Sequence, residues 1–580
     1  MSENNLDSVR HTLAHLLAQA VLEKYPHAKA TIGPSVATGF YYDFDFSGGD
    51  APGDADLSGL QKSMRKSLNK WEGWEREVIS PTEAREHFKG NEYKLELIDA
   101  LEKEGAEITL YTSGGFTDLC RGGHAENPAR DIDARAFKLS TIAGAYWRGD
   151  EKNAMLTRIY GFAFETEEEL KEHLVMLEEA KKRDHRKLGK ELDLFTFSPL
   201  VGPGLPLWTP RGTILRKKLD GFVQSLRSKY GYEEVTIPHF TKKDLYETSG
   251  HWEKFADELF RVKTREGKEF AIKPMNCPHH TQIFARRPHS YREMPRRYSE
   301  TTMVYRDEQS GELGGLTRVI SITQDDSHVF CRTSQLKEEF FGIWDIIDTF
   351  YSTFGFELRV RLSFHDSENQ DKYLGTPEVW EQAENALREI AKERDADYFE
   401  APGEAAMYGP KLDFMARDAI GREHQVATIQ LDLNLPERFD LTCINEQGEK
   451  ERIVMIHCAV MGSLERFIAV LIEHLAGNFP SWLAPEQVRI IPVADVHNDY
   501  AQTVFNTLKA AGVRVHLDVA DDSLGKRIRN TKVDKVPYFF VLGDQESTAN
   551  TVTVESRDDG KIGEMSVEDF ISRLSDEAAY

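Results

Sequence analysis

The spacing of apolar positions changes several times along the chain and divides it into regions. Residues 11–25 have the pattern of a helix, and β-like segments such as residues 38–46 alternate with turn-rich sequence. This mixture predicts an α+β domain over residues 1–165. Residues 166–193 are rich in Glu, Lys and Leu, with leucines at helical spacing, which predicts one long connecting helix.

The region from residue 194 to residue 483 contains both helical and β-strand patterns of apolar residues. Because its helices and strands do not follow strict β-α-β order, we expect a mainly antiparallel sheet flanked by helices. Helical patterns cover residues 213–230, 334–354 and 377–394, and β-like patterns cover residues 357–362 and 452–460.

After Ala484-Pro485 the predicted strands and helices alternate regularly. VRIIPV, VRVHLDV and VPYFFVLG predict three strands separated by two helices, the first of which should end at Gly512. Residues 484–580 are therefore expected to form a separate α/β domain. We expect a multidomain α+β protein, because 580 residues exceed what one hydrophobic core supports.

Composition places the chain among globular proteins. It is 40% hydrophobic and 29% charged, without an apolar run long enough to span a bilayer. The N-terminal sequence MSENNLDSVR has no targeting pattern, so we expect a cytoplasmic protein that does not act at a membrane. The 5 cysteines are scattered and odd in number, which favours free or metal-binding thiols over disulfides.

The net charge limits contact with polyanions. With 73 basic and 97 acidic residues the formal charge is −24, so a nucleic acid must be bound by local basic patches. One basic segment is AKKRDHRKLGK, which ends at Lys190. It is either such a patch or the solvated face of a helix, and the second interpretation is the commoner one for a charged run.

Candidate chemistry is concentrated in a predicted hairpin over residues 299–330. Two β-rich runs flank a glycine-containing loop, and Arg306, Glu308 and Arg318 lie at its margins. Guanidinium groups bind phosphate oxygens, and a carboxylate accepts hydrogen bonds from an exocyclic amine. The pattern fits a nucleotide site and equally an ordinary charged hairpin.

A third element favours the nucleotide site. The apolar run over residues 452–460 leads through Met461-Gly462-Ser463 into a predicted amphipathic helix, with Ser463 in the N-cap position. Arg466 falls in the first turn, where a cation opposes the helix dipole unless an anion lies nearby. A triphosphate would be such an anion.

These segments resemble the three sequence motifs of class II aminoacyl-tRNA synthetases. YGYEEVTIPHF, ending in the strand that contains Pro238, is similar to the first motif, VYRDE with Arg318 to the second, and GSLERF to the third. Within that class the chain most resembles the threonyl-tRNA synthetase family, through KPMNCPHH, QDDSHVF, YGPKLDF, TIQLDLNLPERF and VMIHCAVMGSLERF. The resemblance covers almost the whole chain and implies that residues 194–483 are the class II catalytic domain.

The resemblance implies one zinc ion per subunit, held by Cys277, His328 and His457. Their spacing alone would favour buried residues without a ligand role, and only the surrounding motifs reverse that interpretation. Three protein ligands leave a fourth position open for a substrate. The amino and hydroxyl groups of threonine would fill it.

The resemblance also assigns the activation site, with ATP, Mg²⁺ and L-threonine as ligands. Catalysis would rest on positioning and charge stabilisation, with Arg306, Arg318 and Arg466 as the catalytic cations. The implied ATP-binding residues are Arg306, Glu308, Arg318, Gln425, Ser463 and Arg466, and the implied threonine-binding residues are Asp326, Tyr408, Lys411 and Gln430.

A second set of Cys and His residues lies near the N-terminus. His11 and His15 are on one helical face, and Cys120 and His124 flank a turn with two glycines. HxxxH with CxxxH resembles the editing domain of threonyl- and alanyl-tRNA synthetases, which hydrolyses seryl-tRNA. The four side chains could bind zinc, but the resemblance favours a metal-free site with a positioned water. Further residues at matching positions are Asp118, Tyr42 and Lys94.

Residues 484–580 resemble the anticodon-binding domain of the family, which implies tRNA-Thr as a partner. Lys526, Arg527 and Arg529 suit phosphate contacts, and Glu546 matches an anticodon-reading carboxylate. Glu555 stands where a cation is expected, which leaves the details of anticodon reading open.

The resemblance has two further implications. The chain starts at editing-domain sequence, so we expect it to lack the ubiquitin-like domain that most members carry before it. The first motif usually builds a dimer interface, which implies a homodimer. Two other functions stay open: a regulatory or RNA-binding relative without ligase activity, and a metallohydrolase similar to free-standing tRNA editing proteins, which would explain only the N-terminal third.

Overall fold

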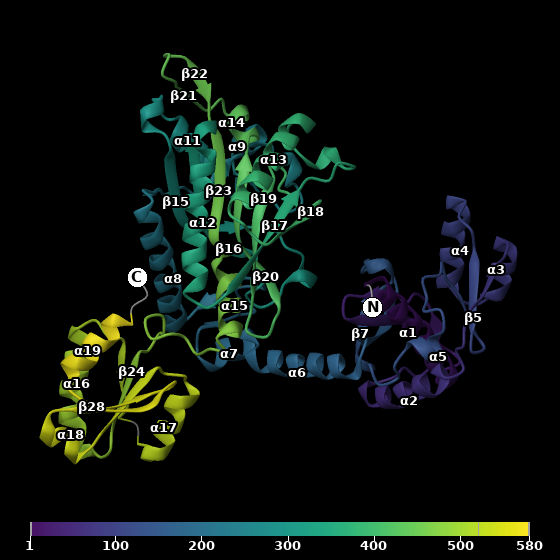
Figure 1. Ribbon diagram of the computed structural model, residues 1–580, viewed down its shortest axis with the longest axis horizontal. Coiled ribbons are helices and arrows are strands. Elements are labelled where there is room, and N and C mark those ends of the chain that lie inside the picture. The colour runs from purple at the N-terminus through teal and green to yellow at the C-terminus, as the bar shows by residue number, and fades with distance from the viewer. Residues whose placement is uncertain (1–2, 520, 578–580) are drawn as a thin grey trace. The chain divides into compact units, whose positions relative to one another are not determined.

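The computed structural model describes residues 3–519 and 521–577 (Figure 1). The chain forms two compact units, one up to Glu178 and one from Glu179 onward. Helices combined with largely antiparallel sheets confirm the predicted α+β class. Within the described residues, no helix has the length and apolar character needed to cross a bilayer.

Helix α1 (Glu3–Lys24) packs on a five-stranded antiparallel sheet in the first unit. Leu13 and Leu17 of α1 are buried in one core with Phe40 and Phe44 of the sheet, and α2 (Leu57–Leu68) packs beside α1. The strands are β1 (Lys29–Ala30), β2 (Ser35–Val36), β3 (Gly39–Asp45), β7 (Phe137–Tyr146) and β8 (Met155–Ala163).

A three-stranded antiparallel sheet completes the first unit. Ala84, Ile98 and Ile108 form a small core between this sheet and its helices. The elements are β4 (Glu75–Val78), β5 (Thr109–Ser113), β6 (Phe116–Leu119), α3 (Pro81–His87) and α4 (Glu92–Glu104), with the short α5 (Pro128–Asp131) further along the chain. Because β6 ends directly before Cys120, this sheet positions the second half of the Cys/His quartet.

The connecting segment is two helices, so the prediction of one long helix was wrong. α6 (Glu167–Arg183) and α7 (His185–Glu191) are separated at Asp184, whose ψ of 119° is not helical. The Asp184 carboxylate accepts a hydrogen bond from the backbone N–H of Arg186 at 2.8 Å. Asp is favoured at a helix N-cap because it satisfies such a free backbone donor, which explains why a new helix begins here.

The second unit contains an eight-stranded sheet in the order β11-β15-β16-β23-β20-β19-β17-β18. Neighbouring strands are antiparallel except at the edges, where β11 is parallel to β15 and β18 to β17, so the predicted antiparallel sheet is confirmed. The strands are β11 (Glu233–Glu234), β15 (Arg296–Tyr305), β16 (Ser321–Cys331), β17 (Glu357–Phe364), β18 (Tyr398–Pro402), β19 (Lys411–Arg417), β20 (Glu423–Asp432) and β23 (Val454–Ser463).

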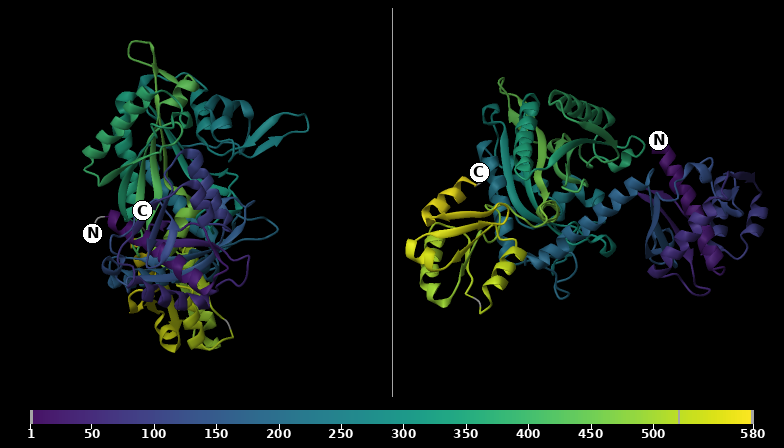
Figure 2. Two further views of the ribbon diagram at one scale, coloured as in Figure 1. Left: turned by 90° about the vertical axis from the view of Figure 1, so that its right-hand side faces the viewer. Right: turned by 60° about the horizontal axis from the view of Figure 1, so that its bottom comes forward.

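Helices cover one face of this sheet (Figure 1, Figure 2). Phe222, Ile347 and Phe467 from three of them share a core with Cys458 and Val460 of β23. Side chains alternate along a strand, so His457 faces the opposite side, which is left for polar residues. The helices are α8 (Pro210–Lys229), α12 (Leu336–Ser352), α13 (Pro377–Glu393) and α15 (Leu464–His474).

Pro238 does not lie in a strand, contrary to the prediction. β11 ends at Glu234, and β12 (Phe240–Lys242) belongs to a separate sheet with β13 (Arg261–Lys263) and β14 (Glu269–Ile272). Proline has no N–H with which to continue a ladder. The backbone N–H of Ile237 instead donates to a carboxylate oxygen of Glu300 at 3.2 Å.

The segment from Val488 onward folds into a five-stranded sheet in the order β25-β24-β26-β27-β28. The parallel strands β24, β25 and β26 and the helices between them confirm the predicted α/β pattern, whereas the antiparallel strands β27 and β28 were not predicted. The elements are β24 (Val488–Pro492), α16 (Asn498–Ala510), β25 (Val515–Leu517), α17 (Leu524–Val533), β26 (Tyr538–Leu542), α18 (Asp544–Ala549), β27 (Val552–Ser556), β28 (Gly560–Met565) and α19 (Val567–Asp576).

Candidate active sites

Two neighbouring strands of the large sheet carry many of the predicted activation-site residues. β16 and β23 pair so that His328 lies opposite His457 and, further along, Gln324 lies opposite Ser463. Asp326 falls between these pairs, and the alternation of side chains places it on the same face as Gln324 and His328. The two pairs are about 13 Å apart at the usual rise of a strand, so one strip of the sheet presents both groups.

Cys277, His328 and His457 converge at one end of this strip. Their ligand atoms lie within 4.8 Å of one another, and all three side chains are buried. His328 Nε2 and His457 Nδ1 are 3.1 Å apart. A tetrahedral zinc ion with Zn–N bonds of about 2.0–2.1 Å would set its ligands about 3.3 Å apart, so the donor set and its spacing fit zinc.

The remaining ring nitrogens of both histidines have partners. His457 Nε2 is 2.9 Å from Asp432 Oδ2, and His328 Nδ1 is 2.7 Å from His280 Nδ1. Such partners orient the rings of metal-ligating histidines. Burial raises the pKa of the Cys277 thiol well above its usual range, so a thiolate here requires a compensating cation.

The predicted amino-acid pocket surrounds this cluster. Asp326 accepts a hydrogen bond from Asn276 Nδ2 at 2.9 Å. The ring of Tyr408 stacks on His457 with 4.6 Å between centroids, and its hydroxyl donates to Gln430 Oε1 at 2.6 Å. These contacts present a carboxylate, a phenol and an amide beside the Cys/His cluster.

A fully buried carboxylate, Asp413, supports two further predicted residues. Its Oδ2 is 3.1 Å from Lys411 Nζ and 2.9 Å from Arg361 Nη2. Arg361 Nη2 also donates to Gln425 Oε1 at 2.8 Å. Lys411 and Gln425 are therefore held by one buried polar network.

All six predicted ATP-binding residues line one cavity of about 370 Å³. Arg318 Nε donates to Glu308 Oε2 at 2.7 Å, so two of them are hydrogen-bonded to each other. Ser463 Oγ accepts a hydrogen bond from the backbone N–H of Arg466 at 3.2 Å, which confirms the predicted N-cap of α15. The lining residues from the prediction are Arg306, Glu308, Arg318, Gln425, Ser463 and Arg466.

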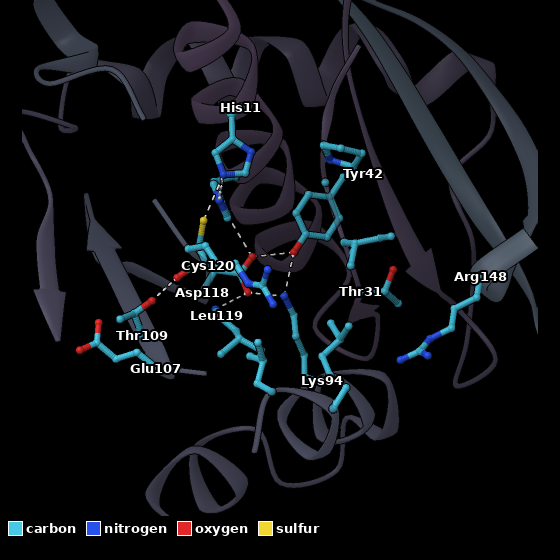
Figure 3. A pocket seen from close by; sticks show the side chains of 18 of the residues that line it. His11, Thr31, Tyr42, Lys94, Glu107, Thr109, Asp118, Leu119, Cys120 and Arg148 are labelled. Carbon is cyan, nitrogen blue, oxygen red and sulfur yellow. Dashed lines mark hydrogen bonds and ion pairs between the residues drawn. The ribbon is translucent and has the colours of Figure 1, made fainter. Parts of the chain in front are cut away.

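The four side chains of the N-terminal quartet converge, and three of them, His11, His15 and Cys120, line a second cavity of about 490 Å³ in the first unit (Figure 3). His11 Nε2 lies 3.0 Å from Cys120 Sγ and 3.3 Å from His15 Nε2. Cys120 Sγ is also 3.3 Å from His124 Nε2. α1 supplies two members and the turn after β6 the other two.

The two glycines in this turn are required by its geometry. Gly122 and Gly123 have φ values of 95° and 88°, a region that glycine adopts without steric cost. The backbone N–H of Gly122 points back and donates to Cys120 Sγ at 3.3 Å. The turn thereby brings a backbone donor to the thiol.

Asp118 links the two remaining predicted residues, Tyr42 and Lys94, to His15 of the quartet, and its contacts with Tyr42 and Lys94 can be followed in Figure 3. Its Oδ2 is 3.0 Å from His15 Nδ1 and accepts from the Tyr42 hydroxyl at 2.6 Å, and its Oδ1 accepts from Lys94 Nζ at 2.5 Å. Burial works against ionisation of Asp118, but the Lys94 cation and the His15 hydrogen bond hold its pKa below the usual range. Against the effect of burial, the hydrogen bond to Asp118 raises the pKa of His15 to about 9.

The environment of Cys120 favours its thiolate form. Burial opposes ionisation, yet hydrogen bonds with His11 and His124 and the neighbouring His15 lower its pKa to about 3. The indole of Trp74 stacks on the His124 ring at 3.8 Å between centroids and fixes that ring. The quartet thus holds a thiolate among imidazoles.

The predicted anticodon residues differ in exposure. Lys526 and Arg529 are exposed on α17, whereas Arg527 is buried and donates to backbone carbonyls at 2.8 and 3.1 Å. Arg527 therefore stabilises its own domain and does not face a phosphate. Glu546 accepts a hydrogen bond from Thr553 Oγ1 at 2.7 Å at the edge of the same domain.

Several residues of the central site were missed at the sequence level. Asp432, His280 and Asn276 lie inside the quoted strings, but their contacts are with residues far away in the sequence, which no spacing rule reveals. His251 lies outside those strings, with Nε2 3.9 Å from Cys277 Sγ. Burial lowers the pKa of His251 to about 3.

Comparisons with known proteins identify the class. Residues 260–475 match the tRNA synthetase class II core domain (G, H, P, S and T), and residues 487–577 match an anticodon binding domain. Residues 108–160 match the threonyl and alanyl tRNA synthetase second additional domain. With its antiparallel sheet and three motifs, this chain is a class II aminoacyl-tRNA synthetase.

Its relatives identify the family. The chain is 47% identical to threonine–tRNA ligase of Cytophaga hutchinsonii over 574 residues, 98% of this chain and 88% of the relative. It is 48% identical to that of Synechococcus elongatus over 580 residues, 98% and 95% of the two chains. The RNA binding domain of threonyl-tRNA synthetase from Cryptosporidium parvum Iowa II aligns with a TM-score of 0.66 at 37% identity, covering 68% of this chain and 99% of that one. The chain belongs to the threonine–tRNA ligase family.

Proposed function

We propose that this chain activates L-threonine with ATP, transfers it to tRNA-Thr and hydrolyses seryl-tRNA-Thr formed in error. The observation that carries the activation step is the pairing of β16 and β23. It presents His328 and His457 at one end of a polar strip and Gln324 and Ser463, in the wall of the 370 Å³ cavity, at the other. Asp326 lies between, where an amino acid and a nucleotide phosphate would meet.

Cys277, His328 and His457 would hold one zinc ion, a Lewis acid with an open position for the amino and hydroxyl groups of threonine. Asp432 and His280 fix the two imidazoles so that one nitrogen of each faces this position. Asp326 is placed to receive the substrate's ammonium group. Tyr408 covers the His457 ring and limits the room for larger side chains.

This pocket explains which amino acids would be refused. Valine has nearly the shape of threonine but lacks the hydroxyl, so it loses a specific polar contact. Serine keeps the hydroxyl, and the missing methyl contact is worth only ~1–3 kcal/mol, too little for accurate translation. Serine must therefore be removed after attachment, and we assign that step to the first unit.

In the activation step a carboxylate oxygen of threonine attacks the α-phosphorus of ATP and diphosphate leaves. A ribose hydroxyl at the tRNA 3′ end then attacks the acyl carbonyl and AMP leaves. Arg306 would bind the α-phosphate, Arg318 and Arg466 the outer phosphates, with Mg²⁺ sharing their charge. Glu308 would accept hydrogen bonds from adenine, and Gln425 and Ser463 would complete the wall.

In the editing step water attacks the seryl ester and the ribose hydroxyl leaves with a proton. At neutral pH His15 is protonated and Cys120 is a thiolate, so His15 is suited to stabilise the developing oxyanion. His11 and His124 would orient the water against the thiolate. Because Asp118 and Cys120 already have cationic partners, we propose that this site works without a metal ion.

The remaining assignments rest on family membership. We propose a homodimer in the cytoplasm, with an anticodon contact through the domain that begins at Val488. Exposed Lys526 and Arg529 would contact phosphates, and Glu546 a base edge. Arg527 would act only by keeping α17 in place.

Two assays on the full chain test the proposal. Threonine-dependent exchange between ATP and pyrophosphate measures activation, and release of serine from seryl-tRNA-Thr measures editing. We expect both activities in one preparation. Absence of exchange would leave a binding relative without ligase activity, or, if serine is still released, a hydrolase that uses only the first unit.

A further inference from the structure

His185, the first residue of α7, is buried and uses both ring nitrogens. Its Nε2 accepts a hydrogen bond from the backbone N–H of Leu316 at 3.1 Å. A backbone N–H can only donate, so the proton of the neutral ring is on Nδ1, which donates to Glu473 Oε1 at 2.7 Å. His185 therefore joins the loop after β15 to the end of α15.

The loop meets this ring at a closely packed point. Leu316 is fully buried in the main core, which also contains Leu188 of α7. Gly315 has a φ of 54°, and a Cβ at this position would lie 2.3 Å from His185 Nε2. Only glycine lets the backbone approach the imidazole this closely.

This anchor lies next to a residue of the proposed ATP site. Arg318 is two positions after Leu316, and its backbone carbonyl accepts from the Gly314 N–H at 3.2 Å. Thr317 and Arg318 both line the 370 Å³ cavity. The hydrogen bond to His185 thus fixes the backbone from which the Arg318 guanidinium extends.

The second partner of His185, Glu473, lies on the same helix as Arg466, which lines this cavity. Glu473 is at the end of α15, whose first turn contains Arg466, and its Oε2 accepts from Arg422 Nη2 at 2.6 Å. Asp184, His185 and Glu473 are close enough for a metal ion. Both nitrogens of His185 are already hydrogen-bonded, however, so we assign this cluster a supporting role.

We propose that His185 is a positioning residue for ATP: it sets the place of the loop with Arg318 relative to the helix with Arg466. This inference rests on the proposed use of the cavity by ATP. His185 acts through the loop and does not touch the nucleotide. Its removal should weaken ATP binding more than it slows turnover at saturating ATP.

Two substitutions separate the two hydrogen bonds. In His185→Gln the side-chain oxygen can take the place of Nε2 and still accept from Leu316. In His185→Asn the shorter amide can reach Glu473 but not the loop. We expect KM for ATP in pyrophosphate exchange to rise roughly 3- to 10-fold in His185→Asn, the effect of one lost hydrogen bond, and much less in His185→Gln. KM for threonine should not change.

His474→Ala is the matched control. His474 is the next residue along α15, and its Nε2 donates a hydrogen bond to the backbone carbonyl oxygen of Phe354 at 3.0 Å without reaching the loop. We expect its melting temperature to fall while KM for ATP stays at the wild-type value. Gly315→Ala, which pushes the loop from the ring, should raise KM for ATP as His185→Asn does.

Equal KM values for ATP in His185→Asn, His185→Gln and the wild type would overturn the inference. So would an equal rise in His474→Ala, since the effect would then be general destabilisation. Arg318→Ala in the same assay tests the proposed ATP site separately. If Arg318→Ala raises KM for ATP and His185→Asn does not, the inference fails alone; if neither does, the ATP assignment of the cavity fails.

Discussion

The two Cys/His clusters contain the same types of side chain, one cysteine with two histidines in the centre and one with three near the N-terminus, in opposite electrostatic settings. In the central cluster burial raises the pKa of Cys277. The ring nitrogens that point into this cluster, His328 Nε2 and His457 Nδ1, are 3.1 Å apart, and the other nitrogen of each ring has a partner outside it. In the N-terminal cluster the imidazoles around Cys120 lower its pKa to about 3.

The difference lies in charge balance. In the first unit the negative Cys120 and Asp118 are matched by the positive His15 and Lys94. The central cluster, with Asp432 and Asp326 nearby, gains a compensating charge when a cation binds. The same types of residue therefore form both clusters, and the charge balance around each cluster indicates whether it needs a metal ion.

The largest effect that would test this contrast is expected for Cys277→Ala. We expect zinc content to fall from one ion per chain to none, and threonine-dependent exchange to fall roughly a thousandfold, because a metal contact is worth several kcal/mol. Hydrolysis of seryl-tRNA-Thr should be unchanged. Metal analysis and the two assays on one preparation measure all three quantities.

Cys458→Ala is the control for that substitution. Cys458 follows His457 along β23 but faces the core, so its loss should lower stability and leave zinc in place. Two zinc ions in the wild-type protein would break the comparison, since the N-terminal quartet would then also bind metal. Zinc retained in Cys277→Ala would instead show that the central cluster does not hold the metal ion.

The next largest effect is expected for His11→Ala. Removing a group that orients water or moves a proton should slow hydrolysis of seryl-tRNA-Thr by roughly 100-fold or more, with exchange unchanged. His27→Ala, an exposed histidine of the same unit, is the control and should hydrolyse at the wild-type rate. A wild-type rate in His11→Ala would contradict the assignment.

A stability measurement tests the charge balance of the first unit. Lys94→Met removes one of the two cations beside the buried Asp118 carboxylate and leaves only His15, which should cost about 3–5 kcal/mol, and Asp118→Asn in the same chain should restore part of it. Urea unfolding, monitored through the hydrogen exchange of backbone amides in α1, measures this loss of stability. The pKa of Asp118 is lowered in the fold, so the contribution of the pair is present above about pH 4 and is lost as the pH falls through the folded value. An unchanged unfolding midpoint in Lys94→Met would show that the pair carries no stability.

The smallest expected effect is an absence of change. Because the pKa of Cys120 is about 3, its reaction with iodoacetamide should have the same rate from pH 5 to pH 8. An ordinary thiol would react about tenfold faster with each pH unit in this range. The other four cysteines are buried, so Cys120→Ser provides the background. A tenfold rise per unit would mean that the quartet does not hold a thiolate.

Much of this arrangement could be predicted from local sequence. The period of apolar positions predicted α8, α12, α13 and β17, and the N-cap rule placed Ser463. The break at Asp184 was missed because a single capping residue interrupted an otherwise continuous helical pattern. Apolar periodicity indicates which face is buried but carries no information about such a local stop.

The site residues also divide into those placed by local sequence and those placed by contacts between distant segments. HxxxH and CxxxH each follow from one turn of chain, so their internal geometry was predictable. The joining of His328 to His457, and of Asp118 to Lys94, depends on strand pairing and helix packing between segments far apart in sequence. Only the family resemblance supplied those pairs in advance, and it gave no role to His185 or Asp432.

The stacking of Trp74 on His124 gives the N-terminal cluster an optical signal of its own. An indole in van der Waals contact with an imidazole loses excited-state energy to that ring, and the loss depends on the ring's charge and distance. Entry of an ester beside Cys120 or a change in the charge of His124 should therefore alter the emission of Trp74. With Trp74→Phe as the blank, occupancy of this cavity could be followed in real time, without a label and independently of turnover.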